Sequence, residues 1–335
     1  MKNIKQRFTK GVIGAFVGLA LTAVGLIAHA NDSWPEHSIT IVVPYPAGGA
    51  ADHSGRAIAR GLEKELGQTV LVDNRPGAAG NIGMAHVARS TPDGYTLGLG
   101  AIGTQTINEF LYDEMPYDSE NDFEPIAMVM TTPNVLAVGP NSPWDSLNEV
   151  IEAAQIAESK GQVLTYASPG VGSSVHLTGE HFQALTGIEL LHVPFRGTAN
   201  SLPAVSNGEV DLLFDNLSGS LSQIQSGELI RGIAQTGTER NSEVPDLPTF
   251  TEAGVEGMDM TSWFALYAPK DTPAAVVEQL IKAAQQALQD PEVADRIYSL
   301  GAAPGELFGA DLAQYEKEQR TIWSELIAEQ NITLE

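Results

Sequence analysis

Residues 39–60 constrain the fold more than any other segment, because a strand, a turn and a helix follow one another directly. Residues 39–43 are apolar or β-branched, which predicts a strand buried on both faces. Residues 44–49 carry two prolines and two adjacent glycines and predict a turn. Apolar residues then recur at helical spacing. The N–H groups at the beginning of a helix lack partners and favour negative charge, so we expect this turn to bind an anion.

The same pattern of strand, glycine turn and helix recurs further along the chain. Residues 70–74 predict a second strand, and residues 95–100 predict a third. Strands that alternate with helices indicate a parallel α/β sheet with right-handed crossovers. Ligands of such sheets bind beyond the carboxyl ends of the strands. We therefore expect one edge of the sheet to carry the turns at residues 47–49, 80–83 and 103–104.

The middle of the chain repeats this pattern and predicts a second α/β domain inserted into the first. Residues 123–138 predict a strand that is interrupted at residues 131–134 on entering the second domain, and residues 263–269 predict the return. Two doubly wound domains joined in this way close around a ligand by a hinge motion. The expected boundaries are 1–30 for a signal peptide, 31–131 with 263–335 for domain 1, and 132–262 for domain 2.

The first thirty residues have the pattern of a secretion signal. Basic residues precede an apolar run over residues 11–28, and Ala28-His29-Ala30 fits a small-x-small cleavage site. Cleavage after Ala30 would place the mature chain in the periplasm. An uncleaved membrane anchor is the alternative, because the run approaches the length that spans a bilayer.

The charge of the chain excludes several classes of partner. There are 18 basic and 42 acidic residues, for a net charge of −24. Such a surface repels nucleic acid and anionic membrane, so neither is expected to bind. It also opposes an anionic ligand, so an anion site must act at short range. The absence of cysteine excludes disulfides and thiolate chemistry.

Two carboxylates stand beside the presumed ligand turns. Asp52 either contacts the ligand or has a structural role, in which it caps the first helix or orders the turn through its amides. Asp215 ends an apolar strand. A contact with the ligand and a structural role are equally open for it. An exported enzyme acting on small acids would use one of these residues as its base. No dinucleotide fingerprint, P-loop or nucleophile elbow is present, so no cofactor is expected.

One cation and one histidine also stand near presumed turns. Arg196 follows a strand, and a guanidinium can hold a carboxylate through two parallel hydrogen bonds. The alternative is an exposed arginine or one paired with nearby acids. Ser173 near His176 suggests a nucleophile and base, but its place at the beginning of a helix favours capping. No metal-ligand pattern such as H-E-x-x-H is present, and no metal is expected.

Several segments together resemble the Bug-type periplasmic receptors, which are the substrate-binding proteins of tripartite tricarboxylate transporters. The signature loop is matched by Pro44-Tyr45-Pro46-Ala47-Gly48-Gly49-Ala50-Ala51-Asp52. Further similar segments are residues 72–80, 166–173 with His176, 193–197, 211–215 and 263–269. The resemblance implies a type II periplasmic-binding-protein fold, with the ligand cleft between two α/β domains.

The resemblance also implies a function. The protein is expected to capture a small mono- or dicarboxylate and deliver it, as a monomer and without catalysis, to the membrane permease subunits of such a transporter. A ligand-sensing receptor for a membrane signalling protein is the alternative, because its fold would be the same.

By position, the resemblance places one ligand carboxylate between the first glycine turn and residues 168–173, held by main-chain amides and bridging waters. Side chains at the far end would set specificity. The chain departs from the family at residues 198–201, where members often carry a glycine-rich run. The expected ligand-binding residues are Tyr45, Ala47, Gly48, Gly49, Asp52, Gly83, Thr104, Ser168, Gly170, Gly172, Ser173, His176, Arg196 and Asp215.

Overall fold

The computed structural model describes residues 34–330 and 332–333. The predicted signal peptide and its cleavage site after Ala30 lie outside these residues. From Pro35 onward the chain forms one compact unit, which contains two lobes of α/β structure. Within the described ranges, no helix combines the length and the apolar character needed to cross a membrane.

The strands of the first lobe position the first three turns. Strands β1 (Ile39–Val43), β2 (Val70–Asn74) and β3 (Thr96–Ala101) are parallel, with β1 in the centre. Strand β9 (Thr261–Pro269) runs antiparallel to β3, and β4 (Phe123–Val138) runs antiparallel to β9. Strand β1 is almost fully buried, as its apolar composition predicts. The turns after β1, β2 and β3 therefore leave the sheet at one edge.

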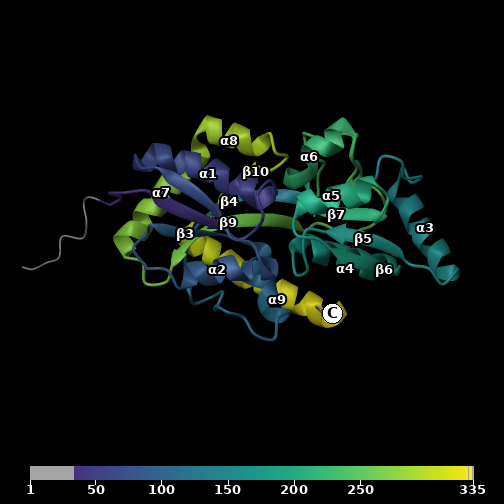
Figure 1. The fold of residues 1–335 in the computed structure, drawn as a ribbon, viewed down its shortest axis with the longest axis horizontal. Coiled ribbons are helices and arrows are strands. Elements are labelled where there is room, and N and C mark those ends of the chain that lie inside the picture. Colours follow the sequence, from purple (N-terminus) through teal and green to yellow (C-terminus); the bar gives the residue numbers. More distant parts are fainter. Residues whose placement is uncertain (1–33, 331, 334–335) are drawn as a thin grey trace, which may run out of the picture. The chain divides into compact units, whose positions relative to one another are not determined.

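Helices cover both faces of these strands (Figure 1). Helices α1 (Ala50–Leu66), α7 (Ala274–Gln289) and α8 (Pro291–Tyr298) pack together on one face. Helices α2 (Asn81–Ala88) and α9 (Gly309–Gln330) lie on the other face and bury a core around Trp263. The two-residue strand β10 (Ala303–Pro304) pairs with β4.

Strand β4 continues into the second lobe without the interruption expected at residues 131–134, so that prediction is wrong. Pro133 is the last residue of β4 to pair with β9, and Asn134 is the first to pair with β7 (Leu212–Asn216). Proline has no N–H to donate to a ladder, and here it stands where one ladder gives way to the next. The strand therefore tolerates it.

The second lobe repeats the parallel arrangement. Strand β5 (Leu164–Ser168) lies between β7 and β6 (Leu190–Pro194), while β8 (Arg231–Gln235) pairs with β4. Its core is built around Tyr166 and Phe214. Its helices are α3 (Leu147–Ser159), α4 (Ser174–Thr186), α5 (Thr198–Ser206) and α6 (Leu217–Ser226). The segment 198–201, where the chain departs from the family pattern, is thus the first turn of α5.

Candidate functional site

A cleft of about 790 Å³ lies between the two lobes, at the ends of the strands. The turns after β1, β2 and β3 form one wall, and the turns after β5 and β6 form the other. This arrangement follows from the parallel strands, whose carboxyl ends meet at one edge in each lobe. The main lining segments are residues 44–47, 49–51, 76–80, 101–103, 169–171, 173–175 and 194–200.

The charge of the cleft differs from that of the whole chain. Among the described residues that line it, Arg196 is the only one with a formally charged side chain. Arg196 is exposed, and its guanidinium forms no ion pair in the part of the chain that the structure describes. A chain with 42 acidic residues thus presents a cleft lining without a carboxylate. This local charge favours an anion.

Two helix beginnings strengthen this preference. Ala50 and Ala51 open α1, a helix of 17 residues, and they line the cleft from the first lobe. Ser174 and Val175 open α4, a helix of 13 residues, and they line it from the second. Unpaired N–H groups at the beginning of a helix carry partial positive charge. The two helices therefore direct positive ends to one cleft from opposite sides.

Asp52 orders the first glycine turn and does not line the cleft. Its Oδ2 accepts hydrogen bonds from Gly48 N–H (3.0 Å) and Arg56 Nε (3.0 Å), and its Oδ1 accepts from Asn74 Nδ2 (3.1 Å). Burial acts to raise the pKa of Asp52, but the hydrogen bonds from Arg56, Gly48 and Asn74 outweigh it and lower the pKa. Of the two roles expected for Asp52, this geometry matches turn ordering. Gly48 donates its N–H to this carboxylate and has a left-handed φ of 86°.

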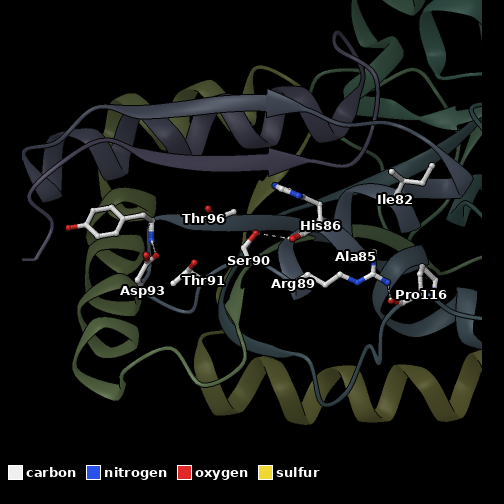
Figure 2. Close-up of a pocket in the computed structure, with 10 residues that line it drawn as sticks. Ile82, Ala85, His86, Arg89, Ser90, Thr91, Asp93, Thr96 and Pro116 are labelled. Atoms are coloured by element: carbon white, nitrogen blue, oxygen red, sulfur yellow. Dashed lines mark hydrogen bonds between the residues drawn. The ribbon is translucent and has the colours of Figure 1, made fainter.

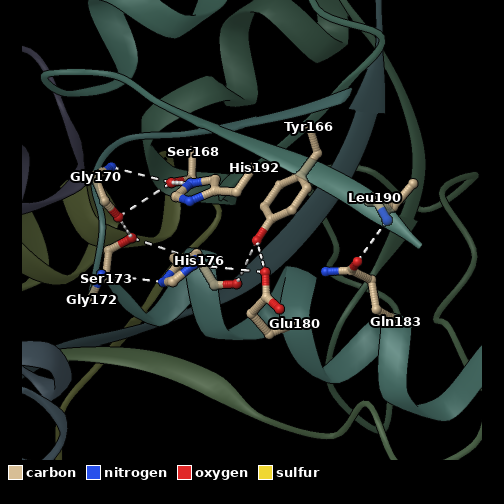
Figure 3. A network of polar contacts seen from close by, with 10 residues as sticks. All are labelled: Tyr166, Ser168, Gly170, Gly172, Ser173, His176, Glu180, Gln183, Leu190 and His192. Carbon is tan, nitrogen blue, oxygen red and sulfur yellow. Dashed lines mark hydrogen bonds and ion pairs between the residues drawn. The ribbon is translucent and has the colours of Figure 1, made fainter. Parts of the chain in front are cut away.

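A pair of stacked histidines supports the turn of the second lobe (Figure 3). The ring centroids of His176 and His192 lie 4.1 Å apart. Gly172 N–H donates to His176 Nδ1 (3.2 Å), while His192 Nε2 bonds Ser168 Oγ (2.7 Å), which also bonds the backbone of Gly170. Burial lowers the pKa of His176 to about 4 and that of His192 to about 3. Two neutral imidazoles thus support the turn at residues 168–173 through hydrogen bonds to Gly172 and Ser168.

Thr104 and Gly83 also act behind the wall of the cleft. Thr104 Oγ1 accepts from the N–H of Ala101 (2.9 Å), the last residue of β3, and so stabilises the end of this strand. A Cβ on Gly83 would lie 2.6 Å from Pro44 Cβ. This glycine therefore lets α2 approach the first turn closely.

Asp215 does not line the cleft, but it precedes the lining residue Asn216 in the chain. Its side chain is buried, with 1 % of the residue exposed. Its Oδ1 accepts from Thr198 Oγ1 (3.0 Å) and Asn216 N–H (2.8 Å), whereas its Oδ2 is buried without a hydrogen-bond partner among residues 34–330 and 332–333. Burial raises the pKa of Asp215 to about 7. Its neighbours Thr198 and Asn216 line the cleft directly.

The predicted residues thus fall into two sets. Those that line the cleft are Tyr45, Ala47, Gly49, Gly170, Ser173 and Arg196. Those that are not part of the lining are Gly48, which is exposed, and Asp52, Gly83, Thr104, Ser168, Gly172, His176 and Asp215, which are buried. Sequence reasoning missed mainly apolar and aromatic lining residues, of which Ile102, Tyr112, Val175, Phe195 and Phe264 are examples. Of these, only Phe195 and Phe264 stood in segments that the sequence analysis singled out, namely residues 193–197 and 263–269.

The second missed feature is the strained backbone of the turn after β2, although a turn at residues 80–83 was expected at this edge. Ala78 and Ala79 line the cleft and have left-handed φ values of 45° and 52°. Alanine adopts this conformation only at a cost, since its Cβ crowds the backbone. The turn presents its backbone to the cleft in a conformation that helix or strand periodicity does not predict.

A separate hollow of about 640 Å³ lies in the first lobe (Figure 2). Its lining includes His86, Arg89 and Asp93, so both signs of charge are present. The Arg89 guanidinium donates to the carbonyl of Pro116 (3.1 Å). None of the predicted site residues lines this hollow. The interlobe cleft remains the candidate site.

Comparison with known proteins agrees with this geometry. Residues 55–332 match the model of the tripartite tricarboxylate transporter family receptor. A Pseudomonas sp. (strain P51) protein, "UPF0065 protein in tcbD-tcbE intergenic region", is 36% identical over 94% of this chain and 93% of its own. Protein BugT of Bordetella pertussis is 34% identical over 87% of this chain and 88% of its own.

Solved structures extend the likeness to the fold. The Rhodopseudomonas palustris protein "Rpa4515 with adipate" is 34% identical with a TM-score of 0.85, over 90% of this chain and 99% of that one. "MatC (Rpa3494) from Rhodopseudomonas palustris with bound malate" is 31% identical with a TM-score of 0.81, over 88% and 99%. The predicted type II periplasmic-binding-protein fold is thereby confirmed. The chain belongs to the receptor family of the tripartite tricarboxylate transporters.

Proposed function

We propose that the protein captures a small mono- or dicarboxylate in the interlobe cleft and delivers it to the permease subunits of a tripartite tricarboxylate transporter. The observation that carries this proposal is the charge of the cleft. Its described lining contains one guanidinium, no carboxylate and the beginnings of two helices, within a chain of net charge −24. Such a site attracts an anion at short range against the field of the surrounding protein.

One carboxylate would lie between the two helix beginnings. Main-chain N–H groups of the first glycine turn and of the turn at residues 169–175 would hold it, with Tyr45 and Ser173 beside it. Arg196 would bind the distal group of a dicarboxylate. Asp52, His176 and Asp215 would act through the backbone they support, not through the ligand.

The remaining features of the proposal concern the whole chain. The protein would act as a monomer in the periplasm, after cleavage following Ala30. The hinge would lie where β4 and β9 join the lobes, with domain 1 at residues 31–131 and 263–335 and domain 2 at 132–262. No catalytic step would occur.

The test is binding of candidate acids followed by transport. Purified mature protein should show a concentration-dependent rise in melting temperature with at least one small carboxylate. Vesicles that contain the permease subunits should then take up that acid only when the receptor is added. Uptake that does not depend on the receptor, together with ligand-dependent capture of a signalling protein, would favour the sensory alternative.

A further inference from the structure

We propose that the cleft selects carboxylates whose carbon body is apolar and discriminates against acids that carry hydroxyl groups along the chain. This inference rests on the proposed function as a carboxylate receptor and names the class of substrate. It follows from how the polar side chains of the cleft wall are already bonded, and from which groups remain unbonded.

The hydroxyl groups of the wall are bonded to the protein. Ser173 Oγ donates to the Gly170 carbonyl (2.6 Å) and accepts from His176 N–H (3.2 Å) at the beginning of α4. Ser174 Oγ bonds Ser262 Oγ (2.6 Å). Thr198 Oγ1, on the second lobe, donates to Asp215 (3.0 Å). Each of these hydroxyls uses its one proton within the protein, or shares it with another hydroxyl.

The side-chain amides of the wall are bonded in the same way. Asn200 Nδ2 donates to the Arg196 carbonyl (2.6 Å). Asn216 Nδ2 donates to Asn134 Oδ1 (2.7 Å) and to Ser262 Oγ (2.8 Å), so both of its protons are used. A ligand hydroxyl that accepts from Asn216 would have to displace one of these bonds, whereas Asn200 keeps one amide proton free of them.

The rest of the side-chain surface is mostly apolar. Ile102 and Phe264 line the cleft from the first lobe, and Val171, Val175 and Phe195 line it from the second. These side chains offer contact to methylene groups or a ring, and nothing to a hydroxyl. Of the two tyrosines in the lining, Tyr45 has a side-chain hydrogen bond with Thr104, whereas no hydrogen bond of the Tyr112 hydroxyl is present among the described residues. The Tyr112 hydroxyl can serve a single polar group.

The groups that remain suit charge. They are the Arg196 guanidinium and the N–H groups at the beginnings of α1 and α4. Carboxylates at the ends of a ligand find these donors, whereas most hydroxyls between them lose water and meet apolar side chains. An unpaired polar group that is buried on binding reduces affinity by about tenfold or more.

The experiment compares matched acids by titration calorimetry on the mature protein. Adipate and galactarate share a carbon chain and both carboxylates, but galactarate carries a hydroxyl on every carbon between them. Glutarate and 2-hydroxyglutarate form a second pair with one hydroxyl. We expect at least about a hundredfold preference for adipate over galactarate and a smaller preference in the second pair, which Tyr112 can moderate.

Two variants test whether the wall causes the preference. Val171→Thr adds a hydroxyl to the cleft and should reduce the preference within each pair by about tenfold. Val163→Thr makes the same change at an exposed position outside the lining and should leave the preference unchanged. Loss of the preference in both variants would overturn the assignment to the wall.

The outcomes separate this inference from the proposed function. Carboxylates that bind with equal or greater affinity when hydroxylated would overturn the inference and leave the receptor function standing. Failure of every carboxylate to bind, with the protein folded by circular dichroism, would overturn both.

Discussion

At the scale of single residues, Arg196 has the clearest expected effect. Arg196→Ala should weaken a dicarboxylate by about 10- to 100-fold, because a charge-assisted hydrogen bond to the distal carboxylate is lost. A monocarboxylate should lose much less. Arg296→Ala removes the same charge from an exposed position on α8 and serves as the control. Calorimetry with an acid of each kind measures both losses, and equal losses would show that Arg196 does not bind the distal group.

A second residue-scale prediction concerns the pH dependence of stability. Because burial raises the pKa of Asp215 from 3.8 to about 7, the folded state retains this proton at a pH where the unfolded state has lost it. Its contribution to stability is full below about pH 4 and is lost as the pH rises through about 7. Asp215→Asn removes this titration. As the pH rises from 4 to 7, the wild type loses unfolding free energy that the variant keeps. The difference between the two should therefore shift in favour of the variant by up to about 1.4 kcal/mol per pH unit.

Urea unfolding of both proteins at pH 5 and pH 8 measures this change. Glu316, whose pKa burial also raises to about 7, is the same in both proteins and cancels in the comparison. The buried histidines cancel for the same reason. A stability difference that does not vary with pH would show that Asp215 ionises normally.

At the scale of elements, two glycines separate binding from folding. A Cβ on Gly49 would meet only Thr198 Oγ1, at 3.8 Å across the cleft. Gly49→Val should therefore abolish ligand binding and leave the free energy of unfolding nearly unchanged. A Cβ on Gly83 would lie 2.6 Å from Pro44 Cβ and 2.8 Å from the Arg75 carbonyl oxygen. Gly83→Ala should destabilise the fold by about 1–3 kcal/mol, because α2 must move away from the turn.

Chemical unfolding and calorimetry on both variants measure these two effects. The reverse pattern, in which Gly49→Val unfolds the protein and Gly83→Ala leaves it stable, would contradict the assignment of the first turn to the cleft wall.

The elements were predictable where local composition decides them. Continuous apolar runs predicted β1 and β3, and helical periodicity predicted α3 at Leu147–Ser159. The predicted break in β4 was wrong because it rested on the missing N–H of Pro133. In the structure, Pro133 lies where pairing with β9 ends and pairing with β7 begins, so the strand continues through it. The turns of the site were predictable because glycines mark them.

The orientation of individual side chains was not predictable in the same way. His176 and Ser168 were expected to contact the ligand, but neither lines the cleft. His176 accepts from the backbone N–H of Gly172, and Ser168 bonds the ring of His192. Ile102 and Phe264 line the cleft although nothing local distinguishes them from core residues. Which way such side chains point depends on how the two lobes meet.

At the scale of the whole molecule, contacts between the lobes are present beside the cleft. His53 Nδ1 lies 3.1 Å from the Ser218 carbonyl oxygen. The buried side-chain amide of Asn108 lies against the second lobe; in the orientation that best satisfies its neighbours, Nδ2 donates to the Gly172 carbonyl of that lobe (3.2 Å) and to the Gly103 carbonyl of its own lobe (3.3 Å). These contacts stabilise the observed arrangement of the two lobes, and neither His53 nor Asn108 lines the cleft.

Asn108→Ala should therefore weaken every ligand by the same factor, about three- to tenfold, because it destabilises the closed form in which all of them bind. Calorimetry with two unrelated carboxylates tests this expectation. A loss confined to one ligand would show that Asn108 contributes to specificity instead of closure.

The central claim is that the interlobe cleft binds a small carboxylate without transforming it. The most direct measurement is a titration of the purified mature protein with small carboxylates, combined with chemical analysis of the recovered ligand. We predict saturation at one ligand per chain, a melting temperature that rises with ligand concentration, and recovery of the ligand unchanged. Sustained conversion of the ligand to a product, or no binding of any carboxylate by the folded protein, would contradict the account.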